Sequence, residues 1–367
     1  MARRTAPPDP APPRVAFLAP LEAAADAAVR APSVHNTQPW RIRLHPARLE
    51  LRADRARQLT VLDPVGRALT QSVGAALLNA RVALAAAGAG VRVDRLPDPG
   101  DPDLAAVLHL TGGPPDQALA RLAPAVRRRR TNRRRYAAER VPEGVLRVLV
   151  AAAAAEDTVL VPVTHEDHVR LLARLTQQAA RVQDADPAYR AELRRWTNRE
   201  PGSGDGVPAG VVPHVDGRQD DLLPLRDFDT AGAGGLPAET RSGADQTLVV
   251  LATHRDDALA WLRCGEALER VLLELTARGW VAGPLTQAVE VPVTRTQLRS
   301  ALTWDAHPQT VLRIGRAPAT SPTPRRPRRD VVENSAAPVP RQVRGRPAAT
   351  GREQRPVSDG RGGTTWV

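Results

Sequence analysis

The chain has 367 residues, enough for one large domain or two of ordinary size, and 42% of them are hydrophobic, which suffices for a buried core. The formal net charge is +12, but residues 316–367 hold eleven Arg and four acidic residues, a net charge of +7, so the rest of the chain is weakly basic. No apolar run is long enough to span a membrane, and a single cysteine, Cys264, excludes an internal disulfide and indicates a reducing compartment. We therefore expect a cytoplasmic protein with disordered ends at residues 1–15 and 331–367, which are rich in Pro, Gly and Arg.

A first unit is predicted over residues 16–115. In chain order, the periodicity of apolar residues predicts an Ala-rich helix at 21–29, a hairpin of strands at 41–44 and 48–52, a short buried strand at 60–62, a helix at 67–87 ending at Gly88, and a strand at 104–110. The Gly-Gly-Pro-Pro sequence at 112–115 then closes the unit.

A second unit is predicted over residues 116–330. Its expected elements are helices at 116–128, 142–155, 165–183 (with Thr164 as N-cap), 187–198 and 256–278, and strands at 158–163, 247–252 and 309–314. Between them, residues 200–245 are rich in Gly, Pro and Asp, with isolated apolar residues at Val211, Val212, Leu222, Leu223, Leu225 and Phe228. A long irregular insertion of this kind is usually functional or disordered, and its apolar residues favour a lid that lies on the protein. We call residues 200–245 the lid segment.

The two units resemble one another in sequence. Placing Gly74 on Gly265 aligns Ala76 with Ala267, Leu77 with Leu268, Leu84 with Leu275 and Gly88 with Gly279. A strand, 60–62 or 249–251, precedes each aligned helix, and a Val-Leu pair lies in the strand that closes each unit. Ala-rich composition produces some of these identities, but the shared order of strand, helix and strand favours an internal duplication.

A polar loop at residues 32–40 follows the first predicted helix. Pro32 ends that helix, and Ser33, Asn36 and Gln38 follow within six positions. Such a loop is an ordinary turn or a site for a planar ligand with several hydrogen-bonding edges. The sequence Pro-Ser-Val-His-Asn-Thr-Gln-Pro-Trp resembles the Pro-Ser-x-x-Asn-x-Gln-Pro-Trp signature of the nitroreductase superfamily. In these flavoenzymes the loop lies along the isoalloxazine ring of FMN.

An arginine-rich run, residues 127–136, contains seven Arg. Taken alone, it is a solvated basic face, a nucleic-acid patch or a site for a cofactor phosphate, because guanidinium groups bind phosphate through paired hydrogen bonds. Tyr136 is the only aromatic residue in the run, which disfavours nucleic acid because stacking platforms need several. Residues 129–133, Arg-Arg-Thr-Asn-Arg, resemble the Arg-Arg-Ser-x-Arg motif that holds the FMN phosphate in nitroreductases.

The order of these motifs resembles the Acg-type branch of the superfamily. Each motif occurs once, with the loop almost a hundred residues before the Arg motif. The resemblance implies an α+β nitroreductase-like fold whose two related halves form a pseudo-dimer in a monomeric chain, with one FMN site and a lid. Residues 280–287 resemble the segment whose backbone passes near flavin N5, and 323–327 the closing basic motif near the phosphate or ribityl chain. The first is otherwise a Gly-Pro helix stop, and the second the start of the basic tail.

The resemblance implies a set of cofactor-binding residues. These are Pro32, Ser33, Asn36, Gln38, Arg129, Arg130, Thr131, Arg133, Pro284, Leu285, Thr286 and Arg325. Ser33, Asn36 and Gln38 would bond the ring, Arg129, Arg130, Arg133 and Thr131 the phosphate, and backbone N–H groups near 284–287 the charge of reduced flavin. No side chain is a compelling general acid or nucleophile, and His165 and His168 lack a third metal ligand nearby.

Two functions remain open at this stage. One is NADPH- or NADH-dependent reduction of a small electron acceptor, a quinone or nitro compound, with access gated by the lid. The other is FMN binding or storage without turnover, if the lid segment fills the substrate space. Nucleic-acid binding is a remote third alternative.

Overall fold

The computed structural model describes residues 18–334 except 198, 201, 216–222, 224–225 and 238–245, together with 356–358 and 364–366. Residues up to Asn334 form one unit. Beyond it, β10 (Pro356–Ser358) and β11 (Thr364–Trp366) form an antiparallel pair of their own. Strands thus lie within the region predicted as a disordered tail, and the predicted segment at 1–15 lies outside the described residues.

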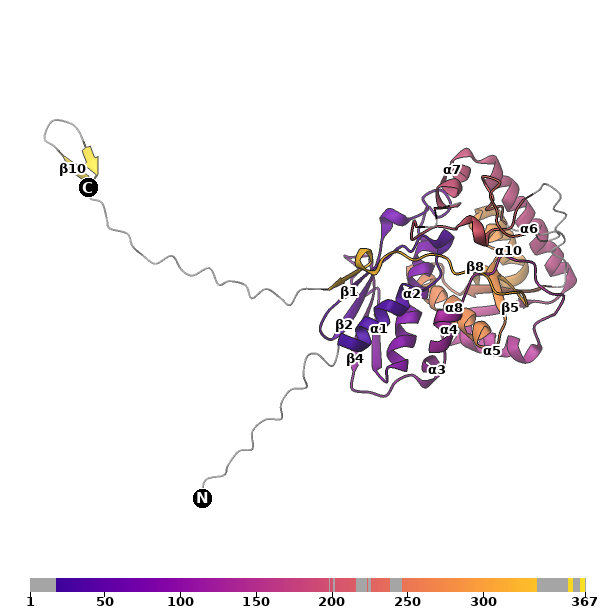
Figure 1. Ribbon diagram of the computed structural model, residues 1–367, viewed down its shortest axis with the longest axis horizontal. Coiled ribbons are helices and arrows are strands. Elements are labelled where there is room, and N and C mark those ends of the chain that lie inside the picture. Colours follow the sequence, from indigo (N-terminus) through magenta and orange to yellow (C-terminus); the bar gives the residue numbers. More distant parts are fainter. Residues whose placement is uncertain are drawn as a thin grey trace, which may run out of the picture. The chain divides into compact units, whose positions relative to one another are not determined.

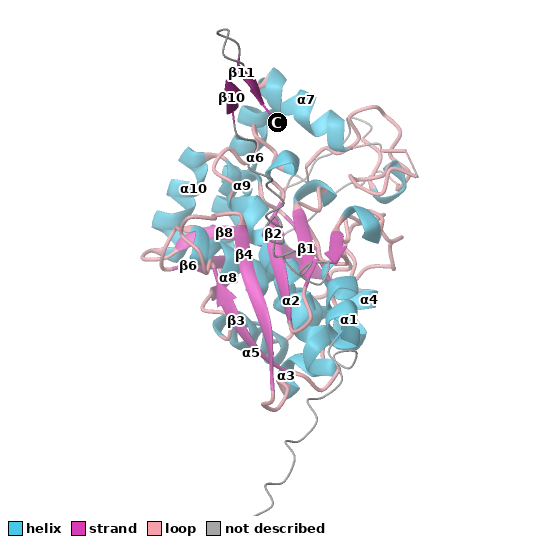
Figure 2. Cartoon of the chain, turned by 90° about the vertical axis from the view of Figure 1, so that its left-hand side faces the viewer, coloured by secondary structure: helices cyan, strands magenta, loops and turns pink. Residues whose placement is uncertain are grey.

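The first sheet has five strands in the order β3-β4-β2-β1-β9 (Figures 1 and 2). Their bounds are β1 (Trp40–Leu44), β2 (Arg48–Ala53), β3 (Gly90–Arg95), β4 (Leu104–Thr111) and β9 (Val332–Asn334). The first four are joined by antiparallel pairing, whereas β9 pairs parallel to β1 from the far end of the chain. Ile42 and Leu44 are buried and Arg41 and Arg43 exposed, as the alternation of side chains along a strand requires.

The second sheet has four antiparallel strands in the order β5-β6-β8-β7. They are β5 (Val159–Val163), β6 (Thr247–Thr253), β7 (Val281–Pro284) and β8 (His307–Gly315). Read from its other edge, this order is β7-β8-β6-β5, and it matches β3-β4-β2-β1 of the first sheet strand for strand.

Each sheet has a long helix between its second and third strands in chain order. These are α2 (Arg67–Ala86) and α8 (Ala258–Ala277), and they lie side by side between the two sheets (Figure 1). They touch at the two glycines that the sequence aligns: a Cβ on Gly74 would lie 2.0 Å from the carbonyl oxygen of Leu262, and one on Gly265 would lie 2.0 Å from that of Gln71. Only glycine therefore fits at this crossing.

The remaining helices cover the sheets. They are α1 (Leu18–Ala28), α3 (Gln117–Ala120), α4 (Ala123–Arg128), α5 (Glu143–Ala154), α6 (Glu166–Ala185), α7 (Pro187–Trp196), α9 (Gln287–Glu290) and α10 (Pro292–Leu298). The first sheet shares a core with α1 and α2. The second sheet shares one core with α5 and α8 and another with α6, α9 and α10. In the described part of the chain, no helix is long and apolar enough to cross a lipid bilayer.

Most predicted elements are confirmed, but several details of the prediction are wrong or incomplete. Residues 60–62 form a turn, because the Glu192 carboxylate accepts the N–H groups of Val61 and Leu62 at 3.1 and 2.9 Å. The strands β3, β7 and β9 and the short helices α9 and α10 were not predicted. The helix expected at 116–128 is split into α3 and α4, because Pro124 has no N–H to donate in a continuous helix. The N-cap of α6 is His165, not Thr164.

Candidate cofactor site

The loop at residues 32–40 has an unusual backbone. His35, Asn36 and Gln38 have φ angles of 45°, 56° and 50°, in the left-handed region that non-glycine residues seldom adopt. Two contacts hold this conformation: the Ser33 hydroxyl accepts the N–H of Gln38 at 2.9 Å, and the Ser72 hydroxyl of α2 accepts the N–H of Val34 at 3.2 Å. Strained backbone that neighbouring contacts fix in this way is often found at functional sites.

The amide side chains of Asn36 and Gln38 point away from the candidate cavities. Asn36 donates to the carbonyl oxygens of Gly206 and Pro324 at 2.8 and 3.0 Å. Gln38 donates to the carbonyl oxygen of Gly204 at 2.9 Å and accepts the N–H of Arg326 at 2.9 Å. Both amides were expected to bond a ligand ring, but in the structure they fasten the lid segment and the segment after β8 to the loop.

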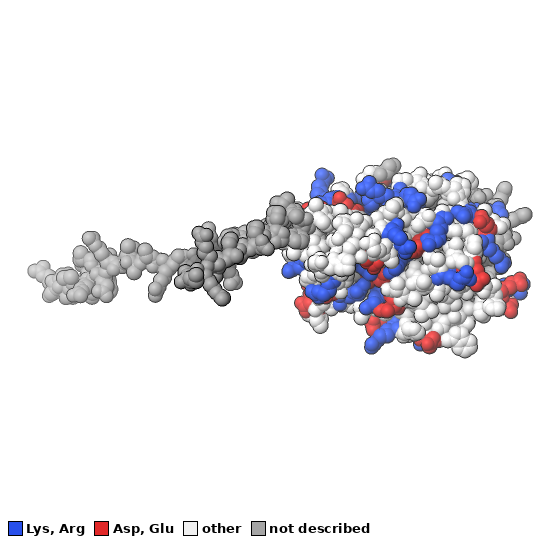
Figure 3. All heavy atoms as spheres, turned by 90° about the horizontal axis from the view of Figure 1, so that it is seen from below, with Lys and Arg blue, Asp and Glu red and all other residues white. Residues whose placement is uncertain are grey.

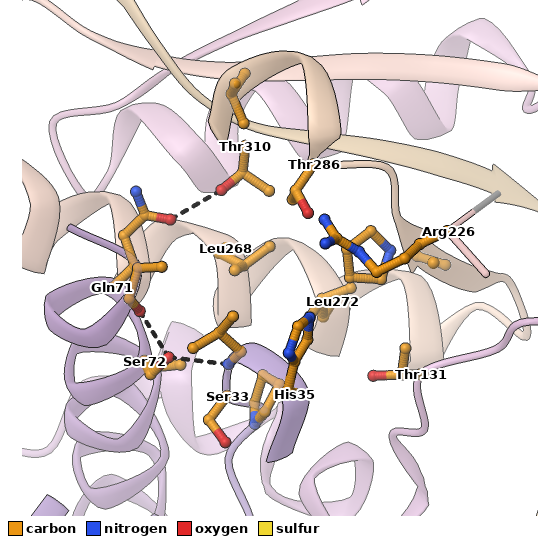
Figure 4. Close-up of a pocket in the computed structure, with 18 of the residues that line it drawn as sticks. Ser33, His35, Gln71, Ser72, Thr131, Arg226, Leu268, Leu272, Thr286 and Thr310 are labelled. Atoms are coloured by element: carbon orange, nitrogen blue, oxygen red, sulfur yellow. Dashed lines mark hydrogen bonds between the residues drawn. The ribbon is translucent and has the colours of Figure 1, made fainter. Parts of the chain in front are cut away.

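A large cavity, here called the main cavity, lies between the loop, α2, α8 and β7 (Figure 4). Six of the predicted site residues line it: Pro32, Ser33, Thr131, Arg133, Pro284 and Thr286. Leu268 and Leu272 of α8 supply an apolar wall, and on the α2 side Gln71 accepts a hydrogen bond of 2.9 Å from the Thr310 hydroxyl. The cavity therefore combines an apolar wall with a few placed polar groups, as small-molecule sites do.

A smaller cavity, here called the arginine cavity, adjoins the main one through Thr131, which lines both. The predicted residues Arg129, Arg130 and Arg325 line it, together with Arg30 and Arg127. No acidic side chain lines it within the described part of the chain. Such a lining favours an anionic group, because several guanidinium groups face one space that no carboxylate lines.

Three predictions for single residues need qualification. Arg133 lines the main cavity and not the arginine cavity, so it lies apart from Arg129 and Arg130. Leu285 lines neither: it is 1% exposed in the core of the second sheet and donates its N–H to Val311. Arg325 lines the arginine cavity, but its guanidinium also donates to the carbonyl oxygens of Arg30 and Ala31, beyond the end of α1.

Further arginines line the main cavity that the motifs did not indicate. They are Arg67, Arg226 and Arg313. Arg313 is 2% exposed, stacks 4.2 Å from the centre of the Tyr136 ring, and lies beside Asn132. The sequence signal that could have indicated Arg313 is a lone Arg in the apolar sequence Val-Leu-Arg-Ile of a buried strand. Burial, with Arg313 nearby, lowers the pKa of Arg133 to about 10.

The lid segment reaches the main cavity at Pro213, Arg226 and Phe228. Phe228 meets the His35 ring edge-on, with 5.5 Å between ring centres, and the Arg133 guanidinium lies 5.0 Å from the centre of the Phe228 ring. Arg226 bonds to Glu290 of α9 and to the Tyr189 hydroxyl of α7. Val211, Val212 and Leu223 are buried as expected, whereas Leu222 and Leu225 lie outside the described residues.

His35 is neutral in this setting. Burial is the main cause, and the neighbouring Arg226 and Arg133 add to it, so that the pKa of His35 falls from 6.5 to about 3. A cationic imidazole would lie among guanidinium groups with only the Glu290 carboxylate to offset them. The histidine therefore serves as an uncharged ring against Phe228 over the ordinary pH range.

The exposed part of the arginine-rich run includes Arg127, Arg128 and Arg135. On the face of the molecule drawn in Figure 3, Arg side chains are interspersed with Asp and Glu. Alternating charges of this kind are typical of a solvated surface.

Sequence comparison finds relatives that extend over most of the chain. "Putative NAD(P)H nitroreductase Rv3131" of Mycobacterium tuberculosis is 40% identical over 313 residues, which is 83% of this chain and 89% of that protein. The chain belongs to the nitroreductase superfamily. "Putative NAD(P)H nitroreductase acg" of the same organism is a further relative, 33% identical over 325 residues, 85% of this chain and 94% of that protein.

Nitroreductases of known structure are also similar to this chain. The FMN-dependent nitroreductase NfnB of Mycobacterium smegmatis, solved in complex with NADPH, matches with 16% identity and a TM-score of 0.37, over 59% of this chain and 100% of that one. No protein-family model matches the sequence.

Proposed function

We propose that this nitroreductase binds one FMN per chain and uses it to reduce a quinone or nitro compound with NADPH or NADH. The observation that carries the proposal is a set of buried guanidinium nitrogens on the arginines that line the two cavities. They are Nη1 of Arg129 and Nε of Arg325 on the lining of the arginine cavity, and Nη1 of Arg67, Arg133 and Arg313 on the lining of the main cavity, and they have no hydrogen-bond acceptor among the described residues. Buried donors are nearly always satisfied, so a set of unsatisfied donors calls for a ligand that brings its own acceptors.

The two adjoining cavities suit the two ends of FMN. Arg129, Arg130 and Arg325 would hold the phosphate in the arginine cavity, with the hydroxyl of Thr131 donating at the junction. In the main cavity Ser33, Arg133 and the segment from Pro284 to Thr286 would border the ring, against the apolar wall from α8. Asn36, Gln38 and Leu285 would act indirectly, by fixing the loop and β7. Bound FMN would supply the redox chemistry, and the chain supplies position, positive charge and exclusion of water.

Arg130→Ala and Arg133→Ala test the assignment of the two ends. Arg130→Ala is expected to weaken the binding of FMN by about 1.5 to 3 kcal/mol. It should leave the binding of riboflavin, which lacks the phosphate, unchanged. Arg133→Ala is expected to weaken the binding of both flavins. Arg135→Ala, an exposed change in the same run, is the control. Fluorescence titration with each flavin gives the affinities, and a purified protein that takes up neither flavin would refute the proposal.

We also propose that the chain acts as a monomeric pseudo-dimer. The matching strand orders of the two sheets and the contact of Gly74 with Gly265 support an internal duplication, with the equivalent helices meeting as two subunits would. The strand that corresponds to β6 is then β2 and not residues 60–62. Sedimentation of the flavin-loaded protein should give the mass of one chain and one FMN; one FMN per two chains would contradict this proposal.

Flavin storage is the second candidate, and the position of the lid segment favours it. Phe228 and Arg226 line the main cavity, and Arg226 is held by Glu290 and Tyr189. Arg226→Gln should release this contact. If the lid gates an enzyme, NADPH should bleach the flavin absorbance slowly in the native chain and severalfold faster in the variant, as for other gating loops. Absence of bleaching in both proteins would leave storage as the function.

A further inference from the structure

A buried carboxylate lies behind the arginine cavity. Glu269 of α8 is 0% exposed, and its Oε1 atom lies 3.3 Å from Nε of Arg129, which is 4% exposed. The apolar side chains of Leu78, Val126 and Leu273 form a core cluster between α2, α4 and α8. A carboxylate and a guanidinium in such surroundings interact strongly, because little water reaches either group.

The charged and polar groups that face Glu269 come from three other elements. Arg129 follows α4, Asn79 lies on α2, and Arg325 lies in the segment after β8. On α8 itself, the nearby Glu266 and Arg270 are bonded elsewhere, Glu266 to Arg81 and Arg95 and Arg270 to Glu156. Glu269 is therefore the carboxylate that offsets the positive charge of the arginine cavity from within the protein.

The arginines around this cavity repel one another. Burial, with Arg129 and other arginines nearby, lowers the pKa of Arg130 below its usual range and that of Arg325 to about 9. Glu269 opposes this effect at Arg325. A phosphate in the cavity would supply the same negative charge from the open side of Arg129, so that the carboxylate and the phosphate compete to neutralise one cluster of cations.

We propose that Glu269 is a positioning residue for Arg129 and that it takes up one proton when a phosphate group enters the arginine cavity. This inference rests on the proposed binding of FMN. The negative charge of Glu269 holds Arg129 in place before the ligand binds. When the phosphate binds, one proton moves from solvent to the carboxylate, and it returns to solvent when the ligand leaves. No bond other than this O–H bond is formed or broken.

The electrostatics of the site make this exchange possible near neutral pH. Burial raises the pKa of Glu269 to about 7, although Arg129, Asn79 and Arg325 act in the opposite direction. A dianionic phosphate raises this pKa further, because a second negative charge disfavours the carboxylate. Above pH 7 the protein must then gain a proton on binding, so affinity falls as pH rises. The phosphate, whose second pKa is about 6, stays dianionic over this range.

Titration of the full chain with FMN and with riboflavin from pH 7.0 to 8.5 tests the proposal. The dissociation constant of FMN is expected to rise about tenfold over this range, while that of riboflavin, which lacks the phosphate, stays constant. Glu269→Gln should flatten the FMN profile, and Glu269→Asp should restore part of it. Glu274→Gln is the matched control, because Glu274 is a buried acid of the same helix that bonds to Arg278.

Calorimetry of the native chain gives a second measurement that needs no variant. FMN binding at pH 7.5, in two buffers of different ionisation enthalpy, should reveal uptake of about 0.7 of a proton, because about a quarter of Glu269 is already protonated at this pH, and riboflavin binding should reveal none. Equal pH profiles for the two flavins, or an FMN profile unchanged by Glu269→Gln, would overturn the inference while FMN binding itself stands. If neither flavin binds at any pH, the proposed function fails and the inference fails with it.

Discussion

The two sheets of this member of the nitroreductase superfamily share one strand order but lie in different surroundings. In the first sheet β1 alternates buried and exposed residues, since α1 and α2 cover one face. In the second sheet all seven residues of β6 are buried, since α5 and α8 cover one face and α6, α9 and α10 the other. Glu290 of α9, one of the helices on the second sheet, holds the lid segment through Arg226, together with Tyr189 of α7. The strand order is common to both units, whereas the residues that hold the lid segment belong to helices outside this shared framework.

The central helices differ in the same way. With Gly74 placed on Gly265, Ala75 of α2 corresponds to Glu266 of α8, and Leu78 corresponds to Glu269. The crossing point is thus the same on both helices, but only α8 carries buried acids beside it. These acids interact with arginines that come from other elements. Both helices therefore provide a glycine for close packing, and only α8 also provides buried carboxylates that balance arginine charges.

The largest expected effect is at the shared crossing point. Gly74→Ala and Gly265→Ala should each lower the free energy of unfolding by more than about 4 kcal/mol, because each new Cβ would overlap backbone of the facing helix. Gly144→Ala in α5 is the control: its Cβ would meet no atom closer than 3.8 Å, so a neutral or slightly stabilising effect is expected. Urea unfolding measures all three. Markedly unequal losses of unfolding free energy for Gly74→Ala and Gly265→Ala would show that the two glycines are not equivalent.

A smaller loss is expected at a position where the helices differ. Glu266 bonds to Arg81 at 2.6 Å and to Arg95 at 2.6 and 2.9 Å, and it is 0% exposed. Glu266→Gln should cost about 3 kcal/mol of unfolding free energy, because it leaves buried guanidinium groups without a counter-charge. Glu143→Gln, which breaks the exposed pair with Arg147, should cost less than about 1 kcal/mol in the same urea assay. Similar losses would show that burial of Glu266 is unimportant.

The smallest expected effect concerns the contact of the first unit's loop with the lid segment. The pKa of His35 is about 3 in the folded protein and near 6.5 when unfolded, so the unfolded chain binds more protons between these values. The contribution of His35 to stability is fully present above pH 6.5 and is lost as pH falls, by about 2 kcal/mol at pH 5. His35→Asn, which tolerates the positive φ, should remove this part of the acid sensitivity. An unchanged pH dependence of unfolding in the variant would contradict the assignment.

Sequence patterns predicted the long helices and most of the longer strands because their apolar periodicity is local. They failed at residues 60–62, where a distant carboxylate satisfies the backbone that a strand would have paired. At the site, Ser33, Arg130 and Thr131 lie at cavities because each belongs to a short contiguous motif. The roles of Asn36 and Gln38 could not be read in the same way, since the left-handed backbone that turns their amides outward depends on α2 and on the lid segment.

Contacts between distant segments account for the positions at the cavities that the sequence did not indicate. Arg226 and Phe228 reach the main cavity only because α7 and α9 hold the lid segment there. Glu269 meets Arg129 across 140 positions of sequence, and nothing in the helix that carries it distinguishes this Glu from its neighbours. A single aromatic residue in an otherwise Gly-rich insertion was the only local sign of Phe228.

The end of the second unit lies against the start of the first. Strand β9 joins β1, and Arg328 bonds to Glu22 and Asp26 of α1. The order of the two units along the chain is therefore not imposed by their packing. A circular permutant in which a short linker joins Asn334 to Leu18, and which opens at the exposed Gly112 and Gly113, should keep every contact of the site while reversing the order of synthesis of the two units.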